Sequence, residues 1–361
     1  MYIEKIKIDN FRNIINEEII PSTGINLIIG KNAQGKTNFI ESIYVVSNLK
    51  SFRGKKLSEI INNNSEKTKI GILFKKNKVS NYLDFEIKND EKNIYLNKKK
   101  ANNLSETLGF LDTVLFYPDD IFIVKGSPSL RRSLLDRAIF QTDNKYLPLF
   151  QNYLRCLRQR NAALKRTDIP AEVWDDKFTD LATKIIFHRL AYIERINGIL
   201  VNLFNEVYRC RESVRIKYPA LAEDPQSCRL KMAERLAVNR DKERVYGVTL
   251  TGPHRDDPQF LLDGKALSLY GSQGQQRSFM LAFKTAQIID FKQHRGIRPV
   301  LLLDDMTSEL DEDRKDSFFE SLLNQAGQVF VTSTDTGLLS HKRFSGASFF
   351  KVENGGIGEY N

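Results

Sequence analysis

The first residues that could do chemistry lie in a glycine-rich stretch near the start of the sequence. Residues 30–37 read GKNAQGKT and fit the pattern GxxxxGK[ST] throughout. In such a loop, backbone N–H groups surround phosphate oxygens, the lysine reaches the β- and γ-phosphates, and the final hydroxyl ligates Mg²⁺. The candidate phosphate-binding residues are Gly30, Lys31, Asn32, Ala33, Gln34, Gly35, Lys36 and Thr37. We expect Lys36 to be catalytic and Thr37 to ligate the metal.

Two adjacent carboxylates, Asp304 and Asp305, follow the apolar run 300–303. Nucleotide enzymes use carboxylates at such positions to hold Mg²⁺ and to orient a hydrolytic water. Taken alone, the pair is also consistent with turn chemistry and a helix cap. Beside a phosphate loop, we predict that Asp304 ligates the metal and that Asp305 polarises the attacking water.

A third motif, Ser-x-Gly-Gln, occupies residues 272–275 at the start of a predicted helix. Ser272, Gly274 and Gln275 would present a hydroxyl, backbone N–H groups and a helix N-terminus to a γ-phosphate. Alone, such a sequence is usually a helix cap. Its order between the phosphate loop and the carboxylates resembles the signature motif of ATP-binding-cassette (ABC) ATPases, and SELD at 308–311 resembles their D-loop. In cassette enzymes the signature of one subunit closes over the nucleotide of the other, so the resemblance implies an ATP-dependent head-to-tail homodimer.

These groups require strands and helices that bring them together. Period-two alternation and short apolar runs predict strands, whereas spacing of three and four residues predicts helices. Strands are expected at 2–8, 25–29, 69–99, 245–262, 299–303 and 328–332, and helices after residue 36, across 128–243 and at 274–294. The later strands are too few to stand alone and must rejoin the first ones. We predict an α/β fold: an ABC-type P-loop ATPase head with a mixed sheet and flanking helices at 1–125 and 245–361, interrupted by an inserted α-helical arm domain at 126–244.

The resemblance to known proteins extends beyond the three motifs. Residues 10–13 (NFRN) resemble the opening of the SMC-like cassette ATPases, where this strand and turn lie against the nucleotide. Arg12 and Asn13 are therefore further candidate cofactor-binding residues. The segments 115–136 and 246–257 are similar to those of the RecF recombination-repair family, as are 268–277 and 301–311. The chain is identified as a member of that family essentially from end to end.

The resemblance to the RecF family implies an ATP-dependent DNA-binding protein of bacterial gap repair, replication restart and SOS induction. It implies ATP and Mg²⁺ as cofactors, single-stranded, gapped or junction DNA as ligand, and action with RecO and RecR to load RecA. The resemblance also implies that DNA stimulates the ATPase, and two departures from cassette enzymes predict that the ATPase is weak and serves as a DNA-binding switch. Asp305 stands where transporters usually carry Glu. The segment VTSTD at 331–335 lacks the usual histidine, so Thr332, Ser333 or Thr334 would contact the γ-phosphate.

Charge points to candidate DNA-binding residues. The 361 residues include 55 Lys and Arg against 45 Asp and Glu, a formal charge of +10. Residues 131–166 hold nine basic residues against two acidic ones, and residues 1–110 hold 17 Lys but only 2 Arg. The candidates for phosphate contacts are Lys55, Lys56, Arg131, Arg132, Arg155 and Arg158. For each of them a solvated surface charge is the competing interpretation, and phosphate contacts predict steep salt dependence.

Composition excludes several other classes. With 41% hydrophobic residues the chain cannot be wholly disordered, and no apolar run approaches the ~20 residues of a membrane span. Three cysteines form no disulfide framework, so a cytoplasmic protein with no membrane partner is expected. An ABC transporter ATPase subunit is the alternative function, although it predicts a hydrophobic docking surface and the missing histidine. His254, in GPHRDD at 252–257, is expected to be structural.

Overall fold

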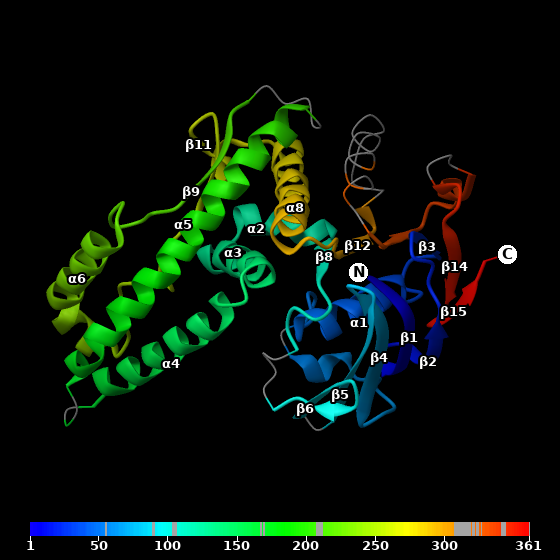
Figure 1. Cartoon of the computed structure of the whole chain (residues 1–361), viewed down its shortest axis with the longest axis horizontal. Coiled ribbons are helices and arrows are strands. Elements are labelled where there is room, and N and C mark those ends of the chain that lie inside the picture. The colour runs from blue at the N-terminus through cyan, green and yellow to red at the C-terminus, as the bar shows by residue number, and fades with distance from the viewer. Residues whose placement is uncertain are drawn as a thin grey trace. The chain divides into compact units, whose positions relative to one another are not determined.

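The chain divides into two compact units, and the first is assembled from both ends of the sequence. The structure, a computed structural model, describes residues 1–54, 56–88, 91–102, 107–166, 168, 170–206, 212–306, 319, 322, 325, 327–340 and 344–360. One unit comprises Met1–Asp120 with Phe291–Asn361, and the other comprises Ile121–Asp290 (Figure 1). The second unit therefore extends past residue 244, the predicted end of the inserted arm.

The first unit contains an antiparallel sheet in the order β2-β1-β4-β5-β6-β7. Its strands are β1 (Tyr2–Phe11), β2 (Ile14–Ile19), β4 (Lys67–Lys76), β5 (Val79–Lys88), β6 (Glu91–Leu96) and β7 (Lys99–Lys100). Alternate residues of each longer strand are buried, as the period-two pattern predicts; Ile70, Ile72 and Phe74 of β4 are completely buried. The other face of the sheet carries polar and aromatic side chains.

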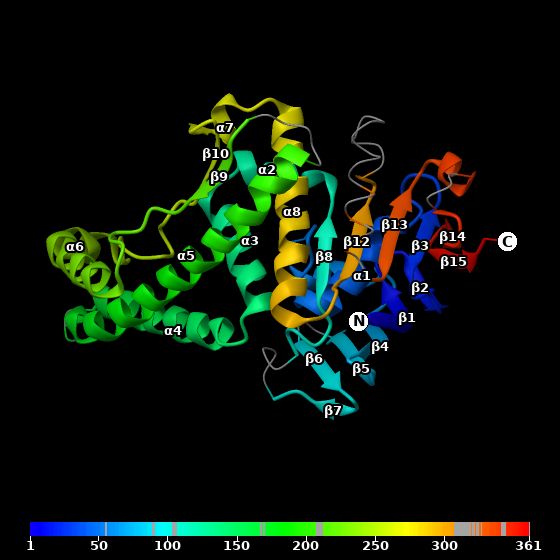
Figure 2. The ribbon, with the colours of Figure 1, turned by 45° about the horizontal axis from the view of Figure 1, so that its top comes forward.

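A second six-stranded sheet of this unit carries the candidate chemistry. Its order is β15-β14-β3-β13-β12-β8, and Figure 2 shows several of these strands side by side. The strands are β3 (Ile25–Ile29), β8 (Thr113–Phe116), β12 (Val300–Asp304), β13 (Val329–Ser333), β14 (Ser348–Glu353) and β15 (Gly356–Glu359). All neighbouring pairs are parallel except β14 with β15. β12 and β13 are buried throughout, which explains their continuous apolar sequences.

Helix α1 (Lys36–Asn48) joins the two sheets through one hydrophobic core. It begins directly after Gly35 and ends at Leu49, whose φ of 57° is left-handed. Phe39 and Ile40 are buried among residues of both sheets, and the rings of Phe39 and Phe330 lie 5.9 Å apart. The helix is therefore held between the sheets, with its N-terminus at the phosphate loop.

The second unit is mainly helical. Its helices are α2 (Ile121–Lys125), α3 (Pro128–Thr142), α4 (Tyr146–Leu164), α5 (Asp175–Glu206), α6 (Pro225–Tyr246), α7 (Leu267–Tyr270) and most of α8 (Gln273–Arg295). A small sheet pairs β9 (Val214–Lys217) with β10 (Gln259–Leu262), which also pairs with β11 (Lys265–Ala266). Because β9 belongs to the helical segment, this pairing places residues 259–266 in the same unit.

One predicted strand is wrong. The sequence VYGVTL at 245–250 suggested a strand, but α6 continues to Tyr246 and Gly247 caps it with a φ of 65°. Short 3₁₀ helices lie at Leu57–Ile60, Pro118–Asp120, Ala171–Trp174 and Thr336–Ser340. Within the described ranges, no helix is both long and apolar enough to cross a membrane.

Candidate nucleotide-binding site

The phosphate loop connects β3 to α1 in a backbone conformation that needs small residues. Ala33 and Gly35 have positive φ angles of 64° and 121°. A Cβ atom on Gly30 would lie 2.4 Å from the carbonyl oxygen of Val352, so only glycine fits there. Lys31, Asn32 and Ala33 are exposed, and Gly35 and Lys36 are buried. The loop thus presents its apex to solvent above the N-terminus of α1, which suits an anion.

Neighbouring segments fix the loop through Gln34. The side-chain amide of Asn13 donates a hydrogen bond to the Gln34 carbonyl at 2.9 Å, and the Gly355 N–H donates to the same oxygen at 2.8 Å. The Asn354 N–H donates to Gln34 Oε1 at 2.7 Å, and Asn38 donates to Asn13 Oδ1 at 2.7 Å. Asn13, predicted to bind the cofactor, lies against the loop and holds it. The β14–β15 turn was missed, although Asn354-Gly355 is a recognisable hairpin signal.

Lys36 lies inside the curve of the loop. Its Nζ donates hydrogen bonds to the carbonyl oxygens of Gly30 at 2.7 Å and Lys31 at 2.9 Å. Burial lowers the pKa of Lys36, and the nearby carboxylates Asp305 and Asp304 oppose that shift. The ammonium group is therefore held at the position where phosphate oxygens would enter the loop.

Thr37 and Asp304 come together from opposite ends of the sequence. The Thr37 hydroxyl donates to Asp304 Oδ1 at 3.0 Å, and the Thr332 hydroxyl donates to the same oxygen at 2.8 Å. The parallel register pairs Asp304 with Thr332, which brings the carboxyl ends of β12 and β13 to one edge. Burial raises the pKa of Asp304, and the hydrogen bonds from Thr332 and Thr37 oppose this. A hydroxyl beside a carboxylate is a donor set that fits Mg²⁺ completed by phosphate and water.

Asp305 leaves the strand with a φ of 49°, and its N–H donates to the Thr332 hydroxyl oxygen at 3.0 Å. Thr332 is completely buried, so its hydroxyl serves the two aspartates and does not face an incoming phosphate, which corrects the expectation for this residue. Ser333 is also completely buried and accepts a hydrogen bond from the Asp335 N–H at 3.0 Å. Thr334 is exposed.

Arg12 has an internal partner in this structure. Its guanidinium forms a two-pronged ion pair with Glu41, at 2.6 Å from Nε to Oε2 and 2.8 Å from Nη2 to Oε1. Glu41 is completely buried on α1 and also accepts from the Ser51 hydroxyl at 2.5 Å. Arg12 therefore anchors the strand β1 to α1 next to the loop. Glu41 was missed, although it is a lone carboxylate within an apolar helical sequence.

The signature residues lie in the second unit and form a reciprocal helix cap. The Ser272 N–H donates to Gln275 Oε1 at 2.8 Å, and the Gln275 N–H donates to Ser272 Oγ at 3.2 Å. This is the capping box of α8, so the cap interpretation describes the geometry here. Ser272 is exposed, Gly274 and Gln275 are half-buried, and Gln275 also donates to Glu212 at 2.9 Å. The D-loop-like residues 308–311 lie outside the described residues.

The six candidate DNA-binding residues divide into three groups. Arg155 and Arg158 are exposed on α4, and Lys56 is exposed in the first unit, whereas Lys55 lies outside the described residues. Arg131 pairs with Asp257 at 2.7 Å, and Arg132 donates to the backbone carbonyl of Asp256 at 2.6 Å. The guanidinium groups of Arg131 and Arg132 thus connect α3 to the 252–257 segment. Both arginines thus have a structural role, and their contact with DNA stays a prediction.

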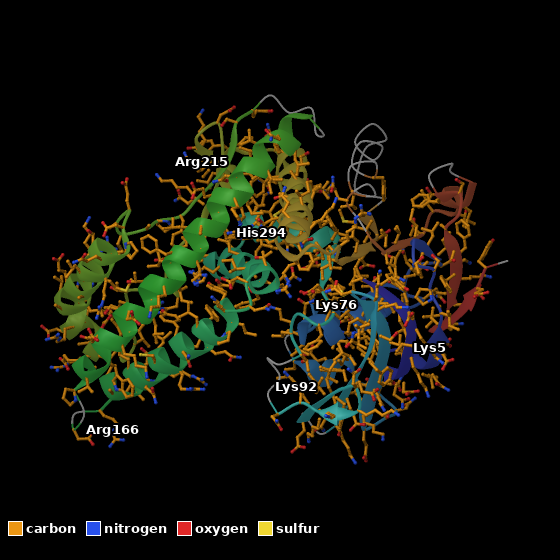
Figure 3. The ribbon with its side chains drawn as sticks, viewed as in Figure 1. Lys5, Lys76, Lys92, Arg166, Arg215 and His294 are labelled. Carbon is orange, nitrogen blue, oxygen red and sulfur yellow. The ribbon has the colours of Figure 1, made fainter. Side chains whose placement is uncertain are left out.

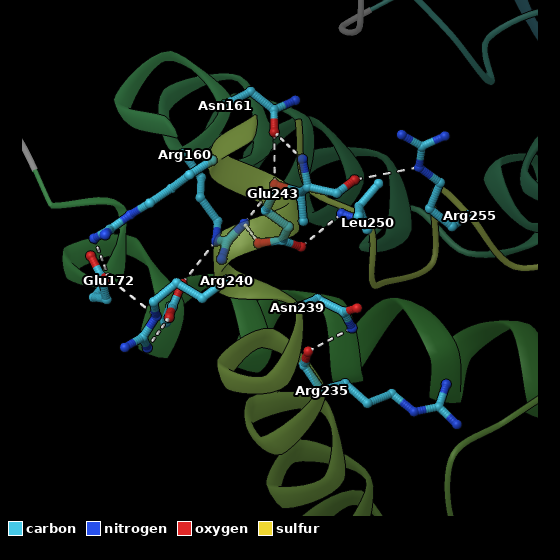
Figure 4. A network of polar contacts seen from close by, with 12 residues as sticks. Arg160, Asn161, Glu172, Arg235, Asn239, Arg240, Glu243, Leu250 and Arg255 are labelled. Carbon is cyan, nitrogen blue, oxygen red and sulfur yellow. Dashed lines mark hydrogen bonds and ion pairs between the residues drawn. The ribbon is translucent and has the colours of Figure 1, made fainter. Parts of the chain in front are cut away.

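His254 is structural, as expected. Its Nε2 lies 3.0 Å from the Thr249 carbonyl, which can only accept, so Nε2 carries the proton and Nδ1 accepts from the Tyr153 hydroxyl at 2.5 Å. Burial lowers the pKa of His254 to about 4, with the nearby Arg255 adding to the effect. Thr249 is also held by two hydrogen bonds: its N–H donates to the Asn161 side chain, and Arg160 donates to its hydroxyl. Asn161 and Arg160 belong to the network shown in Figure 4. No cluster of three His, Cys, Asp or Glu that could hold a metal occurs in the described ranges.

The fold and the three motifs, which are the phosphate loop, the paired carboxylates and the signature sequence, define an SMC-like, ABC-type P-loop ATPase head. A solved Smc head bound to the C-winged helix domain of ScpA shares this fold, with a TM-score of 0.59 over 100% of this chain and 97% of that one at 17% identity. The family model for the RecF/RecN/SMC N-terminal domain matches residues 2–355.

Relatives that match over their full length show which branch of this broad family the chain resembles. The chain is 40% identical to the DNA replication and repair protein RecF of Syntrophotalea carbinolica, covering 100% of both chains. It is 37% identical to that of Geotalea uraniireducens, covering 99% and 100%. A solved recombination mediator RecF with ATP, of the RecFOR pathway, has a TM-score of 0.92 at 32% identity over 100% of this chain and 98% of that one. The chain belongs to the RecF family.

Proposed function

We propose that this protein is an ATP-dependent DNA-binding protein of replication and recombinational gap repair. The observation that carries the proposal is the meeting of Thr37, Asp304 and Thr332 at the mouth of a complete phosphate loop. Relatives of full length bear the name DNA replication and repair protein, and a solved relative holds ATP. ATP is accordingly the nucleotide we assign to this site.

In the proposed reaction, Lys36 and the loop N–H groups bind the β- and γ-phosphates. Thr37 and Asp304 would hold Mg²⁺, which neutralises phosphate charge when it is bound. Asp305, turned out of the strand, would orient the attacking water. An aspartate is shorter than the glutamate of transporter cassettes, and Thr332 is committed to the carboxylates. We therefore propose that ATP hydrolysis is slow and that its rate determines when DNA is released.

We further propose that ATP closes two copies head to tail, with the signature of one copy on the nucleotide of the other. Ser272 is exposed at the N-terminus of α8, where a phosphate could take over the donors of the capping box. The substitution Ser272→Asp separates the two roles of this residue. Aspartate is a good N-cap, so α8 stays stable, but its charge repels a γ-phosphate.

We place duplex DNA phosphates on the exposed face of α4 at Arg155 and Arg158, three residues apart. Neither has a carboxylate partner within the described residues, and Arg158 only donates to the Leu154 carbonyl at 3.4 Å. Lys56 is a further proposed contact. Replacing both arginines by Gln should reduce the slope of log affinity against log salt by about 0.9 for each lost phosphate contact. Arg166→Gln is the control, because Arg166 already pairs with Asp168 at 2.6 Å; Arg166 is labelled in Figure 3.

The remaining parts of the proposal follow the family. They are action with RecO and RecR, loading of RecA, replication restart, SOS induction and a cytoplasmic location. The solved relatives are described as mediators of the RecFOR pathway, which supports these partners.

Sedimentation of the full chain tests the central proposal. With Mg²⁺ and ATP the wild type should form a dimer, whereas Lys36→Ala and Ser272→Asp should remain monomeric. Gapped DNA should change the rate of ATP turnover in the wild type. If ATP produced no dimer and DNA left turnover unchanged, the proposed function would be wrong.

A further inference from the structure

The outer face of the antiparallel sheet in the first unit carries aromatic and aliphatic side chains among charged ones, which include the ion pair of Lys69 with Asp84 at 3.4 Å. The buried side chains of β4 and β5, such as Phe74 and Phe85, face the core that contains α1, so their neighbours along each strand face away. On this outer face Leu73 lies directly opposite Tyr82, and Tyr95 lies opposite Asp84, one step diagonally from Tyr82. Leu73, Tyr82 and Tyr95 are each partly exposed. They form a stripe across three strands.

The ring of Tyr82 lies along the sheet surface. A Cβ atom on Gly71 of the neighbouring strand would lie 2.3 Å from the Tyr82 hydroxyl oxygen and 3.1 Å from its Cζ. The glycine therefore leaves room for the Tyr82 side chain to reach over β4, where Asp84 Oδ1 also lies 3.1 Å from the same Cβ position. Burial raises the pKa of Tyr82 to about 12, and the charge of Asp84 and the hydrogen bond between the two side chains add to this.

Lysines surround this stripe at one end of the sheet. Lys75 pairs with Ser80 across the strands, and Lys100 pairs with Tyr95. Lys78 and Lys98 lie in the two hairpin turns that join β4 to β5 and β6 to β7. The backbone hydrogen bond from Asn97 N–H to the Tyr82 carbonyl, at 2.8 Å, places both turns at the same end. Within the described residues, none of these four lysines has a carboxylate within ion-pair distance, whereas Lys76 pairs with Asp112 at 3.0 Å.

Both turns keep lysine where glycine would be favoured. Asn77 and Lys78 have φ angles of 51° and 67°, and Asn97 and Lys98 have φ angles of 50° and 67°. Two successive left-handed residues define a turn whose second position usually holds glycine. A lysine there strains the backbone and adds charge to a surface that is already positive. The same unfavourable choice therefore occurs at two adjacent turns.

We propose that this tyrosine face, formed by Lys75, Lys78, Tyr82, Tyr95, Lys98 and Lys100, binds single-stranded nucleic acid. Unpaired bases would stack on Tyr82 and Tyr95, and the lysines would contact the phosphates between them. A duplex would present only its phosphate backbone to such a face, because its bases are already stacked on one another. An acidic peptide could pair with the lysines, but it has no bases to stack on the exposed rings. The tyrosine face and the exposed arginines of α4 belong to different units of the chain, and the proposal does not depend on the proposed duplex contacts.

The decisive experiment compares two labelled single strands of about twenty nucleotides, an oligothymidylate and an abasic strand with the same phosphates. The protein is the full chain carrying Arg155→Gln and Arg158→Gln, so that α4 contributes little. The oligothymidylate should bind at least tenfold more tightly. Replacing Tyr82 and Tyr95 by Leu should abolish that difference, and replacing both by Phe should keep it. An oligouridylate arm shows whether RNA is bound as well as DNA.

The lysines are tested by Lys78→Gly with Lys98→Gly. Glycine relieves the strain of both turns, so the melting temperature should rise while affinity for both strands falls at least fivefold. Control substitutions to Gln at Lys67, Lys88 and Lys92, at the opposite end of the sheet (Lys92 is labelled in Figure 3), should leave affinity within about twofold. Equal binding of the thymidylate and abasic strands, unchanged binding by the Leu variants, or equal competition by polyglutamate of matched charge would each overturn the proposal.

Discussion

The hydroxyl of Thr332 donates a hydrogen bond to Asp304 Oδ1 at 2.8 Å, and both side chains are buried at the carboxyl ends of adjacent parallel strands. The same hydroxyl oxygen accepts the N–H of Asp305 at 3.0 Å. One buried hydroxyl therefore sets the orientation of the carboxylate proposed to hold Mg²⁺ and the backbone of the carboxylate proposed to orient water. This is a role in positioning, which hydrolysis kinetics can separate from nucleotide binding.

Thr332→Val should slow ATP hydrolysis about 10- to 100-fold, because it removes the hydrogen bonds to both aspartates at nearly constant volume. Nucleotide affinity should change less than about threefold, since the phosphate loop is untouched. Single-turnover hydrolysis and equilibrium binding of a fluorescent ATP analogue measure the two effects. Thr332→Ser keeps the hydroxyl and should recover most of the rate. A Val variant with the wild-type rate would contradict this role.

Asp304→Asn should stabilise the nucleotide-free protein while it removes Mg²⁺-dependent hydrolysis. Burial raises the pKa of Asp304, which means that its charged form is disfavoured in the folded state. The asparagine keeps an oxygen to accept from Thr37 and Thr332 without that charge. Urea unfolding without nucleotide should give a higher midpoint for the variant. A lower midpoint would show that the hydrogen bonds to the charged carboxylate outweigh the cost of burying it.

Glu243→Gln should destabilise the second unit by about 3 kcal/mol, because it leaves the buried Arg160 with an incomplete set of partners (Figure 4). Glu243 lies 2.7 Å from Arg160 Nη1 and accepts the Leu250 N–H at 2.7 Å. The only tryptophan, Trp174, packs on the small cluster around Ala163 and Leu164 and reports unfolding by fluorescence.

The control for this network is Glu172→Gln. Glu172 pairs with Arg240 at 3.1 Å and Arg244 at 3.0 Å, but both arginine side chains are more than 40% exposed. Surface pairs of this kind contribute about 1 kcal/mol or less. Equal losses for the two variants would mean that burial of Arg160 does not determine the effect.

His254 should make the second unit less stable in mild acid. Its folded-state pKa is about 4 against 6.5 for the ordinary group, because burial disfavours the charged ring. Between these values the unfolded chain binds more protons than the folded one, so stability is complete above pH 6.5 and falls as the pH drops toward 4. The loss is at most about 3 kcal/mol. Denaturation of the wild type and His254→Gln at several pH values should show a shallower dependence for the variant; identical profiles would contradict it.

Local sequence patterns predicted the residues proposed to do chemistry better than the residues that hold them in place. The phosphate loop, Asp304 and the signature sequence are contiguous motifs next to elements with clear periodicity, so each could be recognised from the sequence. Glu41 and the Asn354-Gly355 turn act through contacts between distant segments, which no local pattern encodes. Their positions follow only from the way the sheets and α1 pack.

The roles of charged residues are equally hard to predict from local sequence. Arg131 and Arg155 look alike in a basic stretch, yet one is tied to Asp257 and the other is exposed. The predicted strand at 245–250 failed for a related reason. Val245, Val248 and Thr249 have strand propensity, but Glu243 draws α6 toward Arg160 and Asn161 fixes Thr249 outside any sheet.

The order of strands also constrains how the protein is made. β3, which leads into the phosphate loop, lies between β13 and β14, both of which are synthesised about 300 residues later. At about 5–20 residues per second, the ribosome needs roughly 15–60 seconds to supply these neighbours. The antiparallel sheet of β1, β2 and β4 to β7 and most of the helical unit leave the ribosome earlier. The nucleotide site is therefore assembled last, and a nascent chain should acquire ATP binding only when its final strands are released.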